Sequence, residues 1–249
     1  MVRVLDYEFY SFDNREFVIS PYLSFILKKH VLEVDSVQKH FDFKSILSDV
    51  YLKCETGDII GVLGRNGSGK STLLKVIFGI VRADFKFVRI DGIVKSKTCE
   101  LFTDVSYLIQ DNFIPKSFSV KKAISLSIEK CRIEGFYNDE MIQSIQNKKI
   151  AHLLGGELRY LEIKLLLSNS SKFVLLDEPY NGLSPMMIDK INALIVENAK
   201  IKGVVITDHN YENVIKISTK LMLMKEGKMH HLDDKSELIE KGYLKAGMI

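Results

Sequence analysis

The 249-residue chain lacks the long apolar runs that mark membrane-spanning or secreted proteins. A membrane-spanning helix needs roughly 18 to 20 mostly apolar residues, whereas the best early stretch, Tyr22–Leu27, is far shorter and ends in two lysines. The N-terminus, Met1–Asp6, contains neither a long apolar segment nor a small-residue cleavage site of the kind found in secretory signals. The sequence therefore predicts a soluble, cytoplasmic chain.

Charge of one sign and paired cysteines are also missing. The formal net charge is only +3, from 35 basic and 32 acidic residues, whereas nucleic-acid-binding domains carry a stronger basic excess. Cys54, Cys99 and Cys131 lie far apart without a CxxC pair, which is typical of free thiols in a reducing compartment. We therefore expect no nucleic-acid partner.

What the chain does have is enough apolar material for one large α/β domain, since 46% of its residues are hydrophobic. Asp58–Leu63 is an almost continuous apolar run that stops at a glycine, the pattern of a strand buried on both faces. A glycine-rich segment follows, and Leu73–Phe78 has the character of a helix. Strand, glycine-rich turn and helix form the first half of a βαβ unit.

The rest of the chain alternates between predicted strands and helices. Further strands are predicted at Val31–Val37, Ile46–Leu52, Val105–Ile109, Phe173–Leu176 and Gly203–Thr207, with a hairpin over Leu221–Leu232. Helices are predicted at Ser119–Ile133, at Glu157–Leu167, and from Ser184–Pro185 to about Lys200. A mostly helical stretch at about 111–159 interrupts the strands, so we expect a helical subdomain inserted in a mostly parallel sheet.

The strongest local signal is a match to the phosphate-loop pattern GxxxxGK[ST]. Its residues, with the threonine that follows, are Gly64, Arg65, Asn66, Gly67, Ser68, Gly69, Lys70, Ser71 and Thr72. Glycines allow positive φ and leave room for backbone N–H groups to surround phosphate oxygens, and the helix start adds its positive dipole end. We expect Lys70 to reach the β- and γ-phosphates of ATP and the Ser71 hydroxyl to bind Mg²⁺.

A pair of acids ends the later buried strand, where four apolar residues lead directly into Asp177 and Glu178. In a parallel sheet the carboxyl end of such a strand lies beside the phosphate loop. We therefore predict that Asp177 holds Mg²⁺, directly or through water. Glu178 is predicted to polarise the attacking water as general base.

Taken together, these segments resemble the ABC (ATP-binding cassette) ATPase family, and further motifs follow in the family's order. Gln110 ends a strand where the family has its Q-loop glutamine, and Leu153–Glu157 resembles the LSGGQ signature. Asn181–Ser184 lies where the D-loop follows the carboxylate strand, and His209 matches the switch histidine. The likeness covers roughly residues 31–238.

An aromatic residue that stacks on adenine is also expected from the resemblance. Phe41 lies at about the right position, although Phe43 or His40 are alternatives. The segments Thr207–Asn210 and Gly182–Pro185 look closest to those of the lipopolysaccharide-export and branched-chain amino acid importer ATPases.

The resemblance implies an α/β fold: a P-loop NTPase (RecA-like) core with a mostly parallel sheet, an antiparallel β subdomain and the inserted helical subdomain. These occupy residues 31–249. Residues 1–30 lie outside the likeness and are predicted as an extension of packed strands, with docking to a partner as the alternative.

The resemblance also implies a machine in which each subunit holds only half a site. The phosphate loop of one subunit faces the signature segment of a second ATPase subunit, in a homodimer, so that Leu154, Gly155, Gly156 and Glu157 contact the nucleotide. Catalysis falls to Glu178, His209 and Gln110, and Mg²⁺ is held by Ser71, Gln110 and Asp177. Transmembrane transporter subunits are the other implied partners, which places the chain on the inner face of the cell membrane.

Three residues depart from the family pattern. Leu154 replaces the signature serine and cannot donate its hydrogen bond, Glu157 replaces a glutamine, and Ser184 stands where many D-loops have aspartate. Leu154 thus favours a weakly hydrolysing regulatory subunit as one alternative, although Lys70 and Glu178 oppose it. A soluble ABC ATPase that remodels a macromolecular complex would share every motif, whereas a P-loop kinase or GTPase would not need the signature segment.

The segment after Gln110 is the predicted docking site for a membrane subunit. Asp111–Pro115 is polar, then aromatic and aliphatic, and ends in a proline. We expect Phe113 and Ile114 to be exposed together as a small apolar patch, the kind that marks a partner site. The alternative is that Phe113 packs into the helical lobe.

Overall fold

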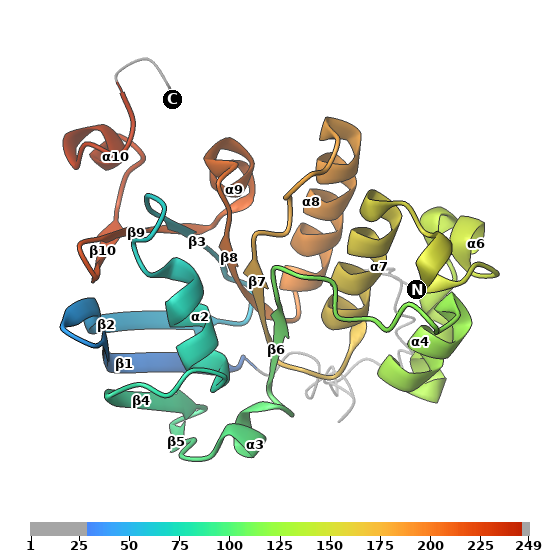
Figure 1. The fold of residues 1–249 in the computed structure, drawn as a ribbon, viewed down its shortest axis with the longest axis horizontal. Coiled ribbons are helices and arrows are strands. Elements are labelled where there is room, and N and C mark those ends of the chain that lie inside the picture. Colours follow the sequence, from blue (N-terminus) through green and yellow to red (C-terminus); the bar gives the residue numbers. More distant parts are fainter. Residues whose placement is uncertain (1–28, 246–249) are drawn as a thin grey trace, which may run out of the picture.

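The computed structural model describes residues 29–245 and builds them around two β-sheets (Figure 1). Almost all of the predicted N-terminal extension, residues 1–28 of 1–30, therefore lies outside the described residues. The larger sheet has six strands in the order β10-β9-β3-β8-β7-β6. They are β3 (Ile59–Leu63), β6 (Val105–Leu108), β7 (Phe173–Asp177), β8 (Gly203–Thr207), β9 (Lys220–Lys225) and β10 (Lys228–Leu232).

Neighbouring strands of the larger sheet are parallel, apart from the β9-β10 hairpin. Every residue of β3, β7 and β8 is buried, because one helix and the smaller sheet cover one face and further helices cover the other. These three strands confirm the predictions made from continuous apolar runs. Their carboxyl ends all lie at one edge, where the phosphate loop also begins.

The smaller sheet has four antiparallel strands in the order β2-β1-β4-β5. They are β1 (Val31–Phe41), β2 (Lys44–Glu55), β4 (Phe85–Ile90) and β5 (Ile93–Val94). Helix α2 (Lys70–Phe78) lies between the two sheets (Figure 1). Its buried face, including Leu73, Leu74 and Ile77, shares one hydrophobic core with strands of both sheets.

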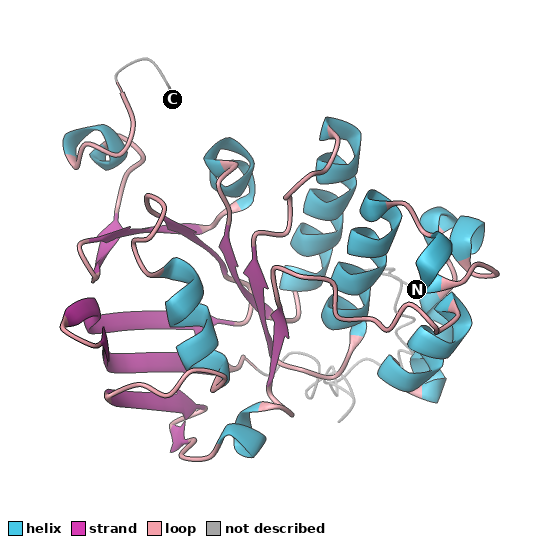
Figure 2. Cartoon of the chain, in the orientation of Figure 1, coloured by secondary structure: helices cyan, strands magenta, loops and turns pink. Residues whose placement is uncertain are grey.

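Helices cover the opposite face of the larger sheet and extend beyond it (Figure 2). The longest are α7 (Gly155–Ser168) and α8 (Pro185–Ala199), and together with the shorter α9 (Tyr211–Ile217) they contribute to a second hydrophobic core. A further helical group, whose buried residues belong to the same core, consists of α4 (Val120–Ser127), α5 (Ile133–Phe136) and α6 (Glu140–Ile145), with 3₁₀ turns at Lys130–Arg132 and Ile150–His152. The short helices α3 (Thr98–Leu101) and α10 (Glu237–Glu240) complete the described residues.

The prediction of one helix over Ser119–Ile133 is wrong, because α4 ends at Ser127 and Ile128 has extended backbone. The apolar spacing that suggested a longer helix included Cys131, which is exposed. Ile128 is buried, and it reaches the core by leaving the helix. Within residues 29–245, no helix combines the length and apolar character that crossing a bilayer requires.

Candidate active site

The phosphate loop connects β3 to α2 and is confined by neighbouring strands. A Cβ atom on Gly64 would lie 2.6 Å from the carbonyl oxygen of Met224 on β9. Gly69 has a φ of 106°, and a Cβ there would lie 3.0 Å from the carbonyl oxygen of Ile46 on β2. Side chains at these two positions would be strained, so the loop needs glycine for its own conformation.

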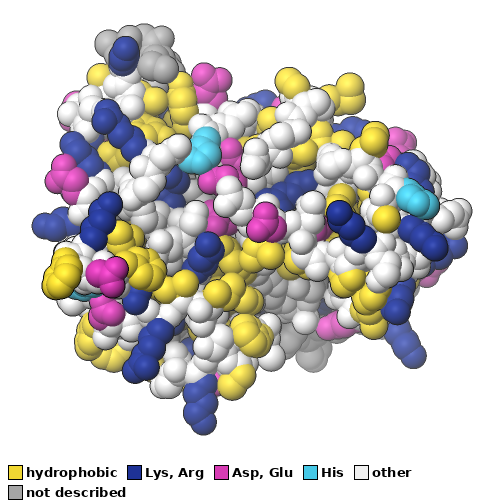
Figure 3. All heavy atoms as spheres, in the orientation of Figure 1, with side chains coloured by type: hydrophobic (Ala, Val, Ile, Leu, Met, Phe, Trp, Pro, Cys, Tyr) yellow, Lys and Arg dark blue, Asp and Glu magenta, His cyan; other side chains and the backbone are white. Residues whose placement is uncertain are grey.

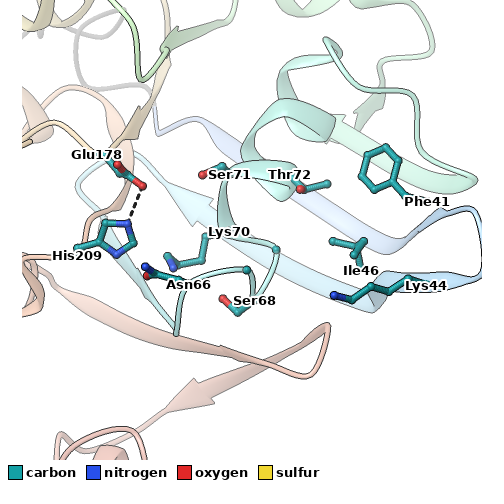
Figure 4. Close-up of a pocket in the computed structure, with 12 residues that line it drawn as sticks. Phe41, Lys44, Ile46, Asn66, Ser68, Lys70, Ser71, Thr72, Glu178 and His209 are labelled. Atoms are coloured by element: carbon teal, nitrogen blue, oxygen red, sulfur yellow. Dashed lines mark ion pairs between the residues drawn. The ribbon is translucent and has the colours of Figure 1, made fainter.

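The loop forms one wall of a cavity of about 490 Å³ (Figure 4). The cavity is lined by Phe41, Lys44, Ile46, Asn66, Gly67, Ser68, Gly69, Lys70, Ser71, Thr72, Glu178 and His209. Phe41 and Ile46 lie beyond the loop on one side, and Glu178 and His209 on the other (Figure 4). Phe41, Phe43 and His40 are the candidates for the residue that stacks on adenine. Of these three, only Phe41 lines the cavity, and Phe43 is fully exposed.

Lys70 is buried beneath the loop. Its Nζ donates hydrogen bonds to the carbonyl oxygens of Gly64 at 2.7 Å and Arg65 at 3.2 Å. Burial lowers the pKa of the Lys70 ammonium, against the opposing effect of nearby carboxylates such as Glu178. The Ser68 Oγ atom is buried without a hydrogen-bond partner in the described chain.

Ser71 and Asp177 meet at the end of the loop. Ser71 Oγ donates a hydrogen bond to Asp177 Oδ1 at 2.9 Å, and Tyr107 donates from its hydroxyl to Asp177 Oδ2 at 2.8 Å. Burial and the Asp177 charge raise the pKa of Tyr107. Sequence reasoning missed Tyr107, and the only available signal was a polar aromatic within a buried strand, whose hydroxyl needs a partner.

The Ser71–Asp177 pair has the right chemistry for Mg²⁺. Among residues 29–245 no cluster of three or more histidine, cysteine, aspartate or glutamate side chains could hold a metal ion. Mg²⁺ in nucleotide sites does not require such a cluster, because one or two protein oxygens, substrate phosphates and water complete its shell. The pair therefore fits an ion that arrives with a nucleotide.

Glu178, His209 and Gln110 are brought together from three strand ends. Glu178 Oε1 lies 2.9 Å from His209 Nε2 (Figure 4), and Gln110 Nε2 donates to Glu178 Oε2 at 2.9 Å. Gln110 is predicted both as a catalytic residue and as a Mg²⁺ ligand. In this structure its side-chain amide faces the Glu178 carboxylate. Glu178 has a φ of 50°, an uncommon conformation for a residue with a side chain and one concentrated at functional sites.

The predicted signature residues lie outside the cavity that the same chain forms. Leu154 is 72% exposed, and Gly155 and Gly156 are the first residues of α7. Glu157 accepts a hydrogen bond from the Leu154 N–H at 2.9 Å and pairs with Lys148 at 2.9 Å.

Arg65, also a predicted nucleotide contact, does not line the cavity either. Its guanidinium instead donates to the Gly242 carbonyl at 3.2 Å. On the face shown in Figure 3, Lys and Arg side chains of the described residues are mixed with acidic and apolar ones.

Comparison with known proteins places this geometry in context. The ABC transporter family matches residues 47–181. The chain is similar to the lipopolysaccharide export system ATP-binding protein LptB of Haemophilus influenzae, with 28% identity over 223 residues, 80% of this chain and 88% of that protein. It is also similar to the galactose/methyl galactoside import ATP-binding protein MglA of Fusobacterium nucleatum, 28% identical over 231 residues, 84% of this chain and 45% of that protein.

Solved structures agree on the fold. The ATP-binding subunit of an ABC transporter superimposes with a TM-score of 0.75 at 19% identity, covering 87% of this chain and 95% of that one. An ATP-binding cassette in its ADP conformation gives a TM-score of 0.72 at 21% identity, covering 86% and 95%. The predicted fold class is thereby confirmed.

Proposed function

The chain belongs to the ABC transporter family and is an ATPase of that family, and on this premise we propose that it couples ATP-driven closure of a dimer to transport by membrane subunits. In this proposal it works in the cytoplasm, on the inner face of the membrane. The relatives named above include an export and an import protein, so the direction of transport is left open.

The surroundings of Gly155 and Gly156 support the proposed dimer. Neither has a positive φ, a Cβ on Gly155 would meet nothing within 4 Å, and one on Gly156 would make only ordinary contacts from 3.5 Å. Glycine in a helix is destabilising by roughly 0.5–1 kcal/mol relative to alanine. The fold of one chain gives no reason for this pair, whereas the close approach of a second subunit's nucleotide does.

In the proposed site, ATP occupies the cavity with its base against Phe41 and its phosphates in the loop. The Lys70 ammonium would exchange the carbonyl oxygens of Gly64 and Arg65 for phosphate oxygens. Ser71 and Asp177 would hold Mg²⁺, which neutralises charge on the phosphates. The first backbone N–H groups of α7 from the second subunit would then face the γ-phosphate, where the helix dipole favours an anion.

Glu178 is the proposed general base. His209 and Gln110 each occupy one of its carboxylate oxygens and so fix the direction in which the carboxylate points. A carboxylate has about four acceptor positions, so Glu178 can still accept a proton from an attacking water. Loss of the γ-phosphate then removes the negative charge that holds the two subunits together.

The proposed docking site for the membrane subunit needs one correction. Ile114 is buried, only 7% exposed, whereas Phe113 is 39% exposed, so the predicted exposed pair is wrong for Ile114. The Ile114 side chain joins the core shared by the helices, because the chain turns inward there. We retain Phe113 as the docking residue, and Phe113→Asp is expected to abolish co-purification with membranes while leaving basal ATPase activity and melting temperature intact.

Glu178→Gln tests the proposed function. Glutamine keeps the size of the side chain and one of its two acceptor oxygens but removes the base, so we expect turnover to fall on the order of 10²–10⁴-fold with ATP binding retained. The variant should also accumulate as an ATP-bound dimer, measured by size-exclusion chromatography with and without ATP. Hydrolysis at the wild-type rate would show that Glu178 is not the base.

A further inference from the structure

A pair of opposite charges lies buried on α7, within about one and a half turns after the signature segment. Arg159 is 5% exposed and Glu162 is fully buried, and the Arg159 Nη1 atom lies 3.5 Å from Glu162 Oε2. The Oε2 atom has no hydrogen-bond partner in the described chain. Burying such a pair gives little net stability, because desolvation offsets the Coulomb attraction, so its placement calls for another explanation.

Arg159 directs its guanidinium at the carbonyl oxygens where two strands of the larger sheet end. Nη1 donates to the Ile109 carbonyl at 3.0 Å. Nη2 donates to the carbonyls of Asp177 at 3.2 Å and Glu178 at 3.0 Å. One side chain therefore binds the residue before Gln110, the last residue of β7 and the acid that follows it.

These bonds lie on either side of the contact between Gln110 and Glu178. The φ of 50° at Glu178 is unfavourable for a non-glycine residue and persists only where its surroundings hold it. On one side the Glu178 N–H donates to the Thr207 carbonyl at 2.7 Å. On the other, Arg159 holds the Glu178 carbonyl, so the guanidinium is one of the groups that fix this conformation.

Glu162 extends the connection to the segment that follows Gln110. Its Oε1 atom accepts a hydrogen bond from the Phe113 N–H at 2.8 Å. The backbone of the half-exposed Phe113 is thus joined through Glu162 and Arg159 to the backbone of Glu178. The connection from the surface segment to the Glu178 backbone therefore consists of two side chains on one helix.

We propose that Arg159 and Glu162 are positioning residues for the hydrolytic site. Arg159 holds Glu178 and Gln110 in register with each other, and Glu162 ties that arrangement to the position of the segment 111–115. A partner that moves this segment thereby changes the placement of Glu178. The inference rests on the proposed role of Glu178 as the base.

A second buried charge pair on the same helix provides a matched control. Lys164 Nζ lies 2.6 Å from Asp139 Oδ2, with side chains 10% and 15% exposed. Asp139 is the N-cap of α6, so this pair joins α7 to the helical group and makes no bond to the ends of β6 or β7. A purely structural role would make the two pairs equivalent in their effects.

The test compares Arg159→Lys with Lys164→Met. Lysine keeps the positive charge but replaces a planar fork by a single ammonium, which cannot bind all three carbonyls in the same geometry. We expect kcat of Arg159→Lys to fall on the order of tenfold to a hundredfold, the scale of a small misplacement of a reacting group. Its affinity for a non-hydrolysable ATP analogue, measured by calorimetry, should be unchanged because the phosphate loop is untouched.

Lys164→Met should show the opposite pattern, with a lower melting temperature and a wild-type kcat. Glu162→Gln, which keeps an acceptor for the Phe113 N–H but loses the charge, should reduce kcat less than Arg159→Lys. Glu162→Gln also serves as the test variant if Arg159→Lys does not fold. If neither variant folds, the Arg159–Glu162 pair is a requirement of the fold, and the proposal is overturned.

Two other results would overturn the proposal. One is a wild-type kcat for Arg159→Lys when Glu178→Gln is inactive, which leaves the proposed function intact. The other is a parallel loss of nucleotide affinity and melting temperature in Arg159→Lys, which makes the pair merely structural. An active Glu178→Gln would instead remove the proposed base itself.

Discussion

Two glycine-rich segments begin helices of this chain: the phosphate loop precedes α2, and the signature segment includes the first residues of α7. In the phosphate loop, a Cβ on Gly64 or Gly69 would approach backbone atoms to 2.6 or 3.0 Å. At Gly155 there is nothing within 4 Å. The first segment is confined by the chain's own strands, whereas the second is open at the surface. A glycine motif therefore has to be judged by the atoms that a Cβ at that position would contact.

Gly69→Ala is expected to have the largest effect on this contrast. Alanine is disfavoured at a φ of 106°, and its Cβ would press against Ile46 and Leu47 of β2. We expect a loss of about 1–3 kcal/mol in the free energy of unfolding together with loss of nucleotide binding. Urea unfolding and calorimetry measure the two effects. Wild-type affinity in this variant would show that the loop tolerates rearrangement.

Lys70→Ala should act on binding more than on folding. It removes the ammonium that would contact phosphate, so affinity for a non-hydrolysable ATP analogue should weaken by at least ~1.5–3 kcal/mol, the scale of a hydrogen bond to a charged group. Lys75→Ala, on the same helix but outside the cavity lining, is the matched control and should bind normally. An unchanged affinity for Lys70→Ala would remove the interpretation of the loop as a phosphate site.

The parts of the fold that could be predicted from sequence are those with a local pattern. β3, the phosphate loop and β7 were found because buried parallel strands are continuous apolar runs and the loop has a strict composition. The strands β4 and β5 were not predicted individually, since Phe85–Ile90 is half exposed and lacks a continuous apolar pattern. Such strands are defined by their partners in the sheet.

Contacts between distant segments were equally hidden. Tyr107 contacts Asp177 from 70 positions earlier in the chain, and Arg159 contacts Asp177 and Glu178 from 18 and 19 positions earlier, on a different element. No local pattern encodes either contact. Ile114 was wrongly expected at the surface because its burial depends on how the segment after β6 turns toward the helices. Periodicity describes one element at a time, whereas these features arise from packing between elements.

Gly155→Ala is expected to change the stability of the isolated chain in the opposite direction from Gly69→Ala. With open space around the position, alanine should raise the free energy of unfolding by up to about 1 kcal/mol. In a Glu178→Gln background it should nevertheless weaken the ATP-bound dimer, because the added methyl occupies the surface that faces the second nucleotide.

Gly135→Ala in α5 is the matched control for that prediction. It too has nothing within 4 Å of its missing Cβ and lies in the helical group of α4, α5 and α6. It should stabilise the chain without affecting the dimer. If both variants dimerise equally well, the glycine at 155 has no role at the interface.

Leu154→Ser tests whether this turn is adapted or impaired. Leu154 is the N-cap of α7, and its N–H already donates to Glu157, which is half of a capping box. A serine would supply the other half, adding about 0.5–2 kcal/mol to helix stability, and a hydroxyl for the γ-phosphate.

Leu154→Ala removes the bulk of leucine without adding a hydroxyl, so it separates crowding from hydrogen bonding. We expect ATP-driven dimerisation, measured in the Glu178→Gln background, to increase in the order Leu154, Leu154→Ala, Leu154→Ser, with the last step worth about 1 kcal/mol. A serine variant that dimerises or hydrolyses ATP less well than the leucine chain would mean that the opposing surface is apolar, and that leucine is the residue this interface requires.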